Sequence, residues 1–215
     1  MPDDAADRRP VDLALCLAVD VSASVSFEEF GLMMGGLAAA WREPGIVAAA
    51  TAGPRGAAAV ALLQWSGRGA REVAVPWRRV EDAASAAGFA DAVDACPRLL
   101  PPGATALGEG MAAGLALLGA LRAPADRLVL DVSGDGVSNA GLPPAEARDV
   151  GVAAGVTING LCVLDEEGAA VLAHYEAEVI GGPGAFAMSC PDYAAFAEAI
   201  ARKLARELRG PTPSA

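Results

Sequence analysis

The first predicted strand constrains the fold of this chain more than any other segment. Residues 11–20 are mostly Val, Leu and Ala; the run ends at Asp20, and Ser22 and Ser24 follow before a helix pattern starts. A mostly apolar run bounded by polar turn residues is typical of a strand buried on both faces of a parallel sheet. Binding sites in such sheets lie at the carboxyl ends of the strands. The polar residues after this strand are therefore the first candidates for a functional site.

Strand and helix patterns alternate along the rest of the chain. Residues 57–65 and 72–77 are predicted to form a β-hairpin, which places an antiparallel strand at one edge of the sheet. Pro44 is expected to end the first helix and to lead into a loop. Helices are expected at about 26–42, 79–95, 107–121, 143–154, 168–179 and 192–209, and further strands at 126–132, 156–164 and 185–189.

This alternation predicts an α/β fold. The expected architecture is Rossmann-like and doubly wound, with a mostly parallel central sheet, one antiparallel edge strand and helices on both faces. The length of 215 residues fits one domain. We expect that domain over residues 11–209, with disordered segments at 1–10 and 210–215.

Charge and hydropathy exclude several classes of partner. The net charge of −11 argues against a nucleic acid or an anionic membrane, because both require clustered cations. The basic residues are scattered except in the last helix, whose exposed side is expected to carry Arg202, Lys203, Arg206 and Arg209. No apolar segment reaches the ~18 to 20 residues that span a bilayer. Residues 1–10 lack the apolar core of a signal peptide, which fits a cytoplasmic chain and equally a mature exported one.

The cysteines and the single histidine give little sign of catalysis. Cys16 and Cys162 fall in core strands, whereas Cys96 and Cys190 lie at element ends, where their pairing is an open question. No CxxC pair or Cys/His cluster is present, which disfavours zinc and thioredoxin chemistry. His174 is predicted to be a surface residue on a helix far from the candidate loops.

Polar residues follow three predicted strand ends or loops that share one edge of the sheet. Asp20, Ser22 and Ser24 follow the first strand, Thr105 follows a Pro/Gly loop, and Asp135 follows the strand at 126–132. Hydroxyl and carboxylate oxygens suit a hard divalent cation. Each residue alone has a structural explanation as a helix cap or turn residue. Their joint position at one edge favours a metal site.

These residues also resemble a known family. Asp20-Val-Ser22-Ala-Ser24 looks like the Asp-x-Ser-x-Ser motif of von Willebrand factor type A domains. Thr105 and Asp135 match that family's two remaining motif positions in the same order. The resemblance covers about 11–209 and implies a metal-ion-dependent adhesion site. Such a site holds Mg²⁺, with Mn²⁺ and Ca²⁺ as alternatives, and takes an Asp or Glu of a protein partner as its final ligand.

A narrower resemblance concerns the compartment. Ser-Gly-Asp-Gly with Asn139, and the late segment at 179–186, are similar to an uncharacterised bacterial branch of the family whose members are usually exported. This resemblance implies a periplasmic or secreted protein. Ala23 departs from the common pattern, which often has Gly at that position, but it leaves every ligand in place.

Three functions from different classes follow from these patterns. The first is a non-enzymatic, metal-dependent protein-binding domain. The second is a metal-assisted phosphoryl-transfer or hydrolytic enzyme with Asp20 as nucleophile, although position 22 is Ser and the only lysine, Lys203, lies in the last helix. The third is a structural domain with a degenerate site. The partner, the preferred cation, the oligomeric state and any movement of the last helix are left open by the sequence.

Overall fold

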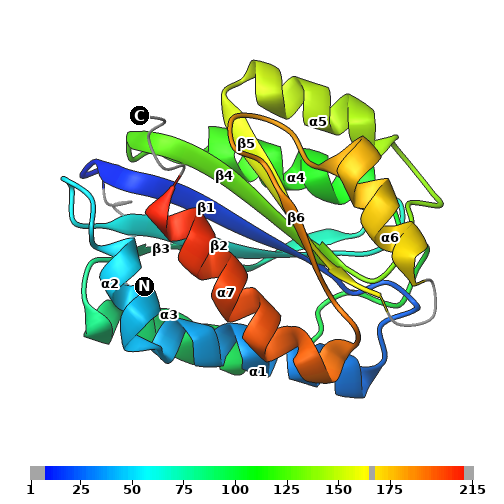
Figure 1. Cartoon of the computed structure of the whole chain (residues 1–215), viewed down its shortest axis with the longest axis horizontal. Helices are drawn as coiled ribbons and strands as arrows, with labels where there is room; N and C mark the ends of the chain where they lie inside the picture. The colour runs from blue at the N-terminus through cyan, green and yellow to red at the C-terminus, as the bar shows by residue number, and fades with distance from the viewer. Residues whose placement is uncertain (1–7, 165–167, 211–215) are drawn as a thin grey trace.

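A six-stranded sheet forms the centre of the molecule (Figure 1). The computed structural model describes residues 8–164 and 168–210. The strand order is β3-β2-β1-β4-β5-β6, in which β3 pairs antiparallel with β2 and all other pairs are parallel. The predicted fold class, including the antiparallel edge strand, is confirmed. The strands are β1 Val11–Asp20, β2 Ala58–Trp65, β3 Arg71–Val80, β4 Ala125–Gly134, β5 Val156–Val163 and β6 Ala187–Cys190.

Helices cover both faces of this sheet. In Figure 1, α1, α2, α3 and α7 lie on one face and α4, α5 and α6 on the other. The helices are α1 Phe27–Arg42, α2 Pro44–Ala50, α3 Ala83–Asp94, α4 Leu107–Gly119, α5 Pro144–Ala153, α6 Ala169–His174 and α7 Phe196–Arg209. A π-helix (η1, Tyr175–Val179) continues α6, and a 3₁₀ turn (η2, Tyr193–Ala195) precedes α7.

The first strand is buried on both faces, as its composition predicts. Leu15 and Leu17 belong to the core between the sheet and the α1/α7 side. Cys16 and Ala18 belong to the core on the α4/α5 side. Because alternate residues of a strand point to opposite faces, one continuous apolar run supplies both cores.

Two local predictions need correction, and one open question is answered. Pro44 does not start a loop but occupies the first turn of α2, where its missing N–H leaves no helical hydrogen bond unmade. The helix expected from residue 79 begins only at Ala83, because β3 extends to Val80 and Asp82 caps α3 through the N–H of Ser85 (2.7 Å). All four cysteines are free, so Cys96 and Cys190 are not paired in this structure.

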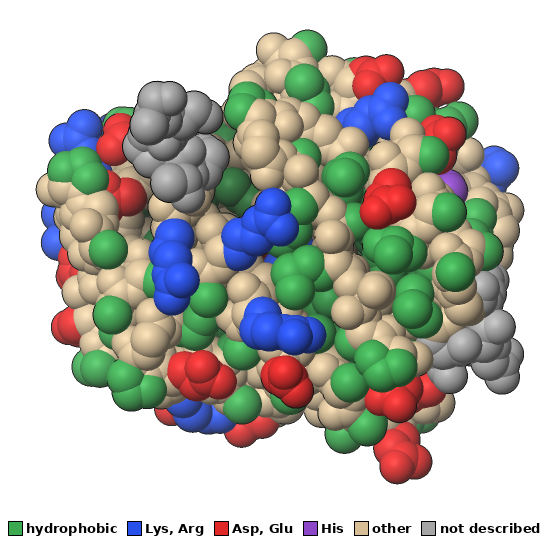
Figure 2. Space-filling model, in the orientation of Figure 1, with side chains coloured by type: hydrophobic (Ala, Val, Ile, Leu, Met, Phe, Trp, Pro, Cys, Tyr) green, Lys and Arg blue, Asp and Glu red, His purple; other side chains and the backbone are tan. Residues whose placement is uncertain are grey.

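Lys203 is buried, contrary to the prediction that it lies on the exposed side of α7. Its Nζ lies 2.6 Å from Asp131 Oδ2 on β4 and 2.8 Å from Glu207 Oε1 one turn along the helix. The amide of Asn159 donates to the same Glu207 oxygen (2.8 Å). A fully buried ammonium requires an anionic partner, and Asp131 provides one. The remaining cations of α7, Arg202, Arg206 and Arg209, are exposed. Figure 2 shows basic side chains over this helix.

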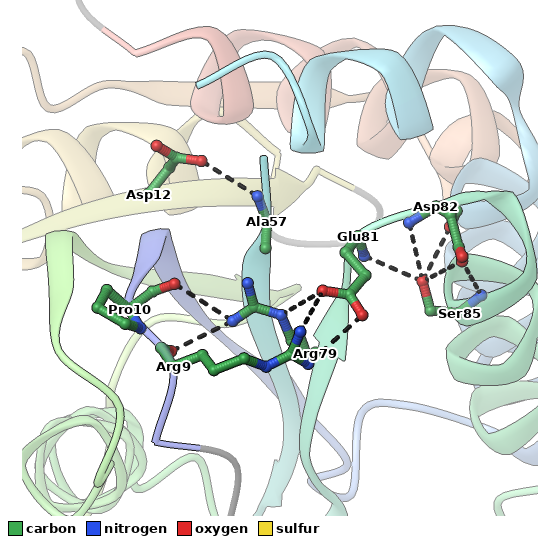
Figure 3. A network of polar contacts seen from close by, with 8 residues as sticks. All are labelled: Arg9, Pro10, Asp12, Ala57, Arg79, Glu81, Asp82 and Ser85. Carbon is green, nitrogen blue, oxygen red and sulfur yellow. Dashed lines mark hydrogen bonds and ion pairs between the residues drawn. The ribbon is translucent and has the colours of Figure 1, made fainter. Parts of the chain in front are cut away.

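The start of β1 is tied to β3 by a polar network (Figure 3). The Arg79 guanidinium donates to the backbone carbonyls of Arg9 and Pro10 (both 3.2 Å) and to Glu81 (2.6 Å). The Arg9 side chain also reaches Glu81 (3.2 Å).

Of the segments predicted to be disordered, residues 1–7 and 211–215 lie outside the described residues. None of the described helices has the length and apolar character needed to cross a bilayer.

Candidate metal-binding site

The candidate site lies where the strand order reverses. β2 and β3 lie on one side of β1, and β4, β5 and β6 lie on the other. In doubly wound sheets, ligands bind at the carboxyl ends of the strands at this point. Asp20 is the last residue of β1, and Asp135 directly follows the last residue of β4, Gly134. The two carboxylates predicted from the sequence therefore leave neighbouring strands at the same edge.

Four of the five predicted ligands are connected by short contacts. The backbone N–H of Ser22 donates to Asp20 Oδ1 (2.7 Å). The hydroxyl of Ser24 donates to Asp135 Oδ1 (2.7 Å) and lies 3.2 Å from the hydroxyl oxygen of Ser22. The loops that follow β1 and β4 thus meet through side-chain oxygens.

Thr105 reaches this cluster from the loop before α4. Its N–H donates to the side-chain oxygen of Asn139 (2.9 Å), and its carbonyl accepts from the N–H of the same residue (3.1 Å). Gly136 lies against the Thr105 side chain, since a Cβ added at Gly136 would be 3.4 Å from Thr105 Oγ1. The structure therefore brings all five predicted residues to one place, and Thr105 faces the turn that carries Asp135.

Arg98 supports the loop after β1 and was missed by the sequence analysis. Its guanidinium donates to the carbonyls of Val21 (2.7 Å), Ser22 (2.8 Å) and Val25 (2.7 Å). These three carbonyls belong to the loop that carries the ligand hydroxyls. Arginine suits this role because its planar group presents several donors in a fixed arrangement.

Two buried polar residues at the end of β2 hold the segment that carries Arg98. The amide of Gln64 donates to the Pro97 carbonyl (2.9 Å) and accepts from the N–H of Leu99 (2.8 Å). The hydroxyl of Ser66 donates to the Pro101 carbonyl (3.1 Å). Polar side chains within an otherwise apolar strand were the available sequence signal for these contacts, because buried polar groups need partners.

Burial governs the electrostatics of the two carboxylates. Asp20 is fully buried, and its Oδ2 has no hydrogen-bond partner among the described residues. Burial, together with the nearby charge of Asp135, raises the pKa of Asp20 to about 8, against the hydrogen bonds from Ser22 and the charge of Arg98. Burial also raises the pKa of Asp135, and the hydrogen bond from Ser24 opposes that rise.

Both tyrosines of the chain lie near these carboxylates. The Tyr175 and Tyr193 hydroxyls are buried and are in hydrogen-bond geometry with no described residue. The nearby Tyr193 hydroxyl nevertheless favours the ionised form of the Asp135 carboxyl and so lowers the pKa of Asp135. Tyr175 belongs to the core on the α4/α5 side of the sheet, and its hydroxyl lies near Asp20. Both come from segments remote in sequence from the motif, so no local pattern indicates them.

His174 lies closer to the site than predicted. The backbone N–H of Ser138, three residues after Asp135, donates to His174 Nε2 (3.2 Å). The histidine is therefore a half-buried residue that contacts the loop after β4, not a surface residue remote from it. Its ring nitrogen stabilises that loop.

The donor set suits a hard divalent cation. It consists of two carboxylates and three hydroxyls, all of them oxygen donors, which suit Mg²⁺, Mn²⁺ or Ca²⁺. Among the described residues, no group of three or more His, Cys, Asp or Glu side chains is arranged to hold a metal. The unpartnered Asp20 Oδ2 and the raised carboxyl pKa values fit a place where a positive charge would be favourable. The residues present therefore fit a cation.

Comparison with protein families gives one match. The model of a family described as a protein of unknown function (DUF1194) matches residues 10–212. No curated protein matches the chain.

Solved structures with the same fold include a mussel byssus protein and bacterial pilus proteins. Proximal thread matrix protein 1 from the mussel byssus has a TM-score of 0.68 and 16% identity, with 92% of this chain and 47% of that chain covered. The vWF domain of the type V pili tip protein Mfa5 from Porphyromonas gingivalis has a TM-score of 0.61 and 10% identity, covering 95% and 99% of the two chains. The pilus adhesin SpaC from Lactobacillus rhamnosus GG has a TM-score of 0.66 and 16% identity, covering 94% and 30%.

These likenesses identify the fold as that of a von Willebrand factor type A domain, as the sequence resemblance predicted. This chain spans about half the length of the mussel protein and about a third of SpaC. A further structure of the mussel protein is described as having a zinc-occupied MIDAS motif, the metal-ion-dependent adhesion site of this fold; it has a TM-score of 0.62 and 16% identity, with 92% and 47% of the two chains covered.

Proposed function

The chain belongs to the DUF1194 family, and we propose that it is a non-enzymatic protein-binding domain that depends on a divalent metal. Asp20, Ser22, Ser24, Thr105 and Asp135 hold the ion, which is Mg²⁺, with Mn²⁺ and Ca²⁺ as alternatives. When bound, the ion supplies a coordination position for an Asp or Glu carboxylate of a partner protein. This adhesion-type domain extends over residues 11–209.

One observation carries this proposal: among the described residues, three hydroxyls and two carboxylates converge at the edge of the sheet, and a buried carboxylate oxygen of Asp20 has no hydrogen-bond partner there. Two carboxylates match the charge of a divalent ion. The negative charge of Asp135, however, is also stabilised by the Ser24 hydroxyl and by Tyr193, so it is not directed at the ion alone. Hydroxyl ligands are neutral, so the ion remains attractive to a further anion. A carboxylate from a partner is the oxygen ligand that completes such a shell.

The surroundings of Asp20 argue against the enzymatic alternative. Phosphoryl transfer through an aspartate commonly uses, besides the metal ion, a Lys or Arg near the transferred group. The only lysine, Lys203, is buried in contact with Asp131 and Glu207. Arg98 directs its terminal donors to three loop carbonyls. Neither cation is therefore available to a substrate at Asp20.

The proposed location of the protein follows from the sources of structures with the same fold. The three structures compared above come from a mussel byssus and from bacterial pili. We therefore propose that this domain acts outside the cytoplasm, in the periplasm or as a secreted protein, and binds another protein there.

The first test is a calorimetric titration of the EDTA-stripped protein with Mg²⁺ and with Mn²⁺. The double variant Asp20→Ala/Thr105→Ala removes one carboxylate and one hydroxyl from the site. The control Asp91→Ala/Thr51→Ala removes the same two groups from α3 and the end of α2. We expect one-site binding in the wild type and the control and none in the first variant. Equal binding by all three proteins would refute the site.

The second test addresses the partner carboxylate. A short peptide with one central glutamate is titrated into the protein with Mg²⁺ and with excess EDTA, beside the same peptide with glutamine. We expect the glutamate peptide to raise Mg²⁺ affinity, because the two ligands bind the same ion. If the two peptides have the same effect, the acidic partner is excluded and a metal site of another purpose remains.

A further inference from the structure

Two buried polar atoms on different elements face one point at the metal site. The hydroxyl of Tyr175 and Oδ2 of Asp20 are each inaccessible to solvent and in hydrogen-bond geometry with no described residue. A Cβ built on Gly134 would lie 2.9 Å from the tyrosine hydroxyl and 3.0 Å from Asp20 Oδ2. The two oxygens thus approach the same point from different elements. Buried tyrosine hydroxyls and carboxylate oxygens are normally partnered, so their convergence calls for an explanation.

The backbone around Tyr175 directs its side chain to this point. Tyr175 is the first residue of the π-helix that continues α6, and its carbonyl accepts from the N–H of Ile180, five residues on (3.0 Å). Short π-helical segments occur frequently at functional sites. The ring crosses β5 at Gly160, where a Cβ would lie 2.5 Å from the Tyr175 ring. The absence of a side chain at Gly160 therefore allows the ring to reach the edge of the sheet.

Gly134 completes this arrangement. It is the last residue of β4, directly before Asp135. Any other residue would place a Cβ within about 3 Å of both the tyrosine hydroxyl and Asp20 Oδ2, so one of these groups would have to move. The two glycines have different tasks, since Gly160 admits the ring and Gly134 keeps its hydroxyl and Asp20 Oδ2 free to interact.

We propose that Tyr175 is a positioning residue of the metal site, whose hydroxyl, when the metal is bound, donates a hydrogen bond to Asp20 Oδ2 directly or through one water molecule. This inference rests on the proposed metal-binding function. The N–H of Ser22 already holds Oδ1 of Asp20 (2.7 Å), so a donor on Oδ2 fixes the carboxylate from both sides. Groups that orient a metal ligand in this way commonly change metal affinity by about 10- to 100-fold when they are removed.

Tyr175→Phe tests the role of the hydroxyl with little change in shape. Mn²⁺ affinity is measured from the electron paramagnetic resonance signal of free Mn²⁺, and the melting temperature is measured separately in EDTA. We expect Mn²⁺ affinity to fall about tenfold or more. The melting temperature of the metal-free protein should stay the same or rise, because the substitution removes a buried hydroxyl that lacks a partner. A purely structural role would instead lower the melting temperature and leave the affinity unchanged.

A matched control and a second variant complete the experiment. Thr51→Val removes a hydroxyl that donates to the Val47 carbonyl on α2 (3.0 Å), and it should leave Mn²⁺ affinity unchanged. Gly134→Ala introduces a methyl group that crowds both the Tyr175 hydroxyl and Asp20 Oδ2, and it should weaken Mn²⁺ binding at least as much as Tyr175→Phe.

The outcomes separate this inference from the function on which it rests. If the wild type binds Mn²⁺ and Tyr175→Phe binds it equally well, the role of Tyr175 is wrong and the metal site stands. If the wild type binds no Mn²⁺, the proposed function fails and the inference fails with it. Weaker binding in Tyr175→Phe, with an undiminished melting temperature, supports both.

Discussion

Asp20 carries a proton that competes with the metal ion. Burial first, and the charge of Asp135 second, raise the pKa of this carboxyl to about 8, so the metal-free protein holds it mostly neutral at pH 7. A divalent ion binds the ionised form. We therefore expect Mg²⁺ affinity to rise as the pH increases from about 6 to 8, by up to about tenfold per pH unit, and then to level off.

Calorimetry in two buffers of different ionisation enthalpy measures the proton released on binding. The wild type should release up to one proton from Asp20 per Mg²⁺ at pH 7. Asp20→Asn offers the control, because its neutral amide has no proton to lose; it should bind more weakly and release fewer protons. A pH-independent affinity in the wild type would mean that Asp20 is already ionised without metal.

Single residues of the site differ in how far the sequence reveals them. Asp20, Ser22 and Ser24 follow a strand with a strong pattern, and Thr105 and Asp135 share their motif, so the fold class places all five at one edge. Arg98 acts through three backbone carbonyls, and Tyr175 acts through Oδ2 of Asp20. Only the folded chain brings these groups together. No periodicity or motif in one sequence encodes such contacts.

At the scale of elements, α7 is held to the sheet by buried charge. Lys203 contacts Asp131 of β4 (2.6 Å) and Glu207 of its own helix (2.8 Å). Lys203→Met removes the cation and leaves the Asp131 carboxylate buried without its counter-ion. We expect the free energy of unfolding, measured in urea at pH 7, to fall by about 3 to 5 kcal/mol.

A second substitution isolates the charge from the packing. Lys203→Met/Asp131→Asn replaces the pair with two neutral side chains and should recover more than half of the stability lost by the single variant, since uncompensated buried charge causes most of the loss. If the double variant is no more stable than Lys203→Met, packing rather than charge explains the loss.

Two predictions at the scale of elements were wrong because the residue concerned suits two different local structures. Pro44 predicts the end of one helix, but proline equally suits the first turn of another, and α2 begins there. The cations of the last helix predict an exposed Lys203, although it adjoins the apolar stripe of Ile200 and Leu204. Its partner Asp131 lies within a buried strand, where a carboxylate needs a cation, and this was the signal that the sequence did contain.

At the scale of the whole molecule, buried carboxyl groups make stability depend on pH. Burial raises the pKa of both Asp20 and Glu207 to about 8, from ordinary values of 3.8 and 4.5, and it also raises the pKa of Asp135. Between about pH 5 and 8, Asp20 and Glu207 keep their protons in the folded state and lose them in the unfolded state. Because the unfolded chain then binds fewer protons, stability falls as the pH rises.

We therefore expect the metal-free protein to melt several degrees lower at pH 8 than at pH 5, and self-repulsion from the net charge of −11 adds to this trend. Mg²⁺ should raise the melting temperature more at pH 8, where Asp20 gives up its proton readily, than at pH 5.

Glu207→Gln mimics the protonated carboxyl in the α7 cluster, which consists of Lys203, Asp131 and Glu207. It should flatten the pH dependence in EDTA and leave the response to Mg²⁺ intact, which separates the α7 cluster from the metal site. A melting temperature that rises from pH 5 to 8 in EDTA would contradict the raised carboxyl pKa values in both places.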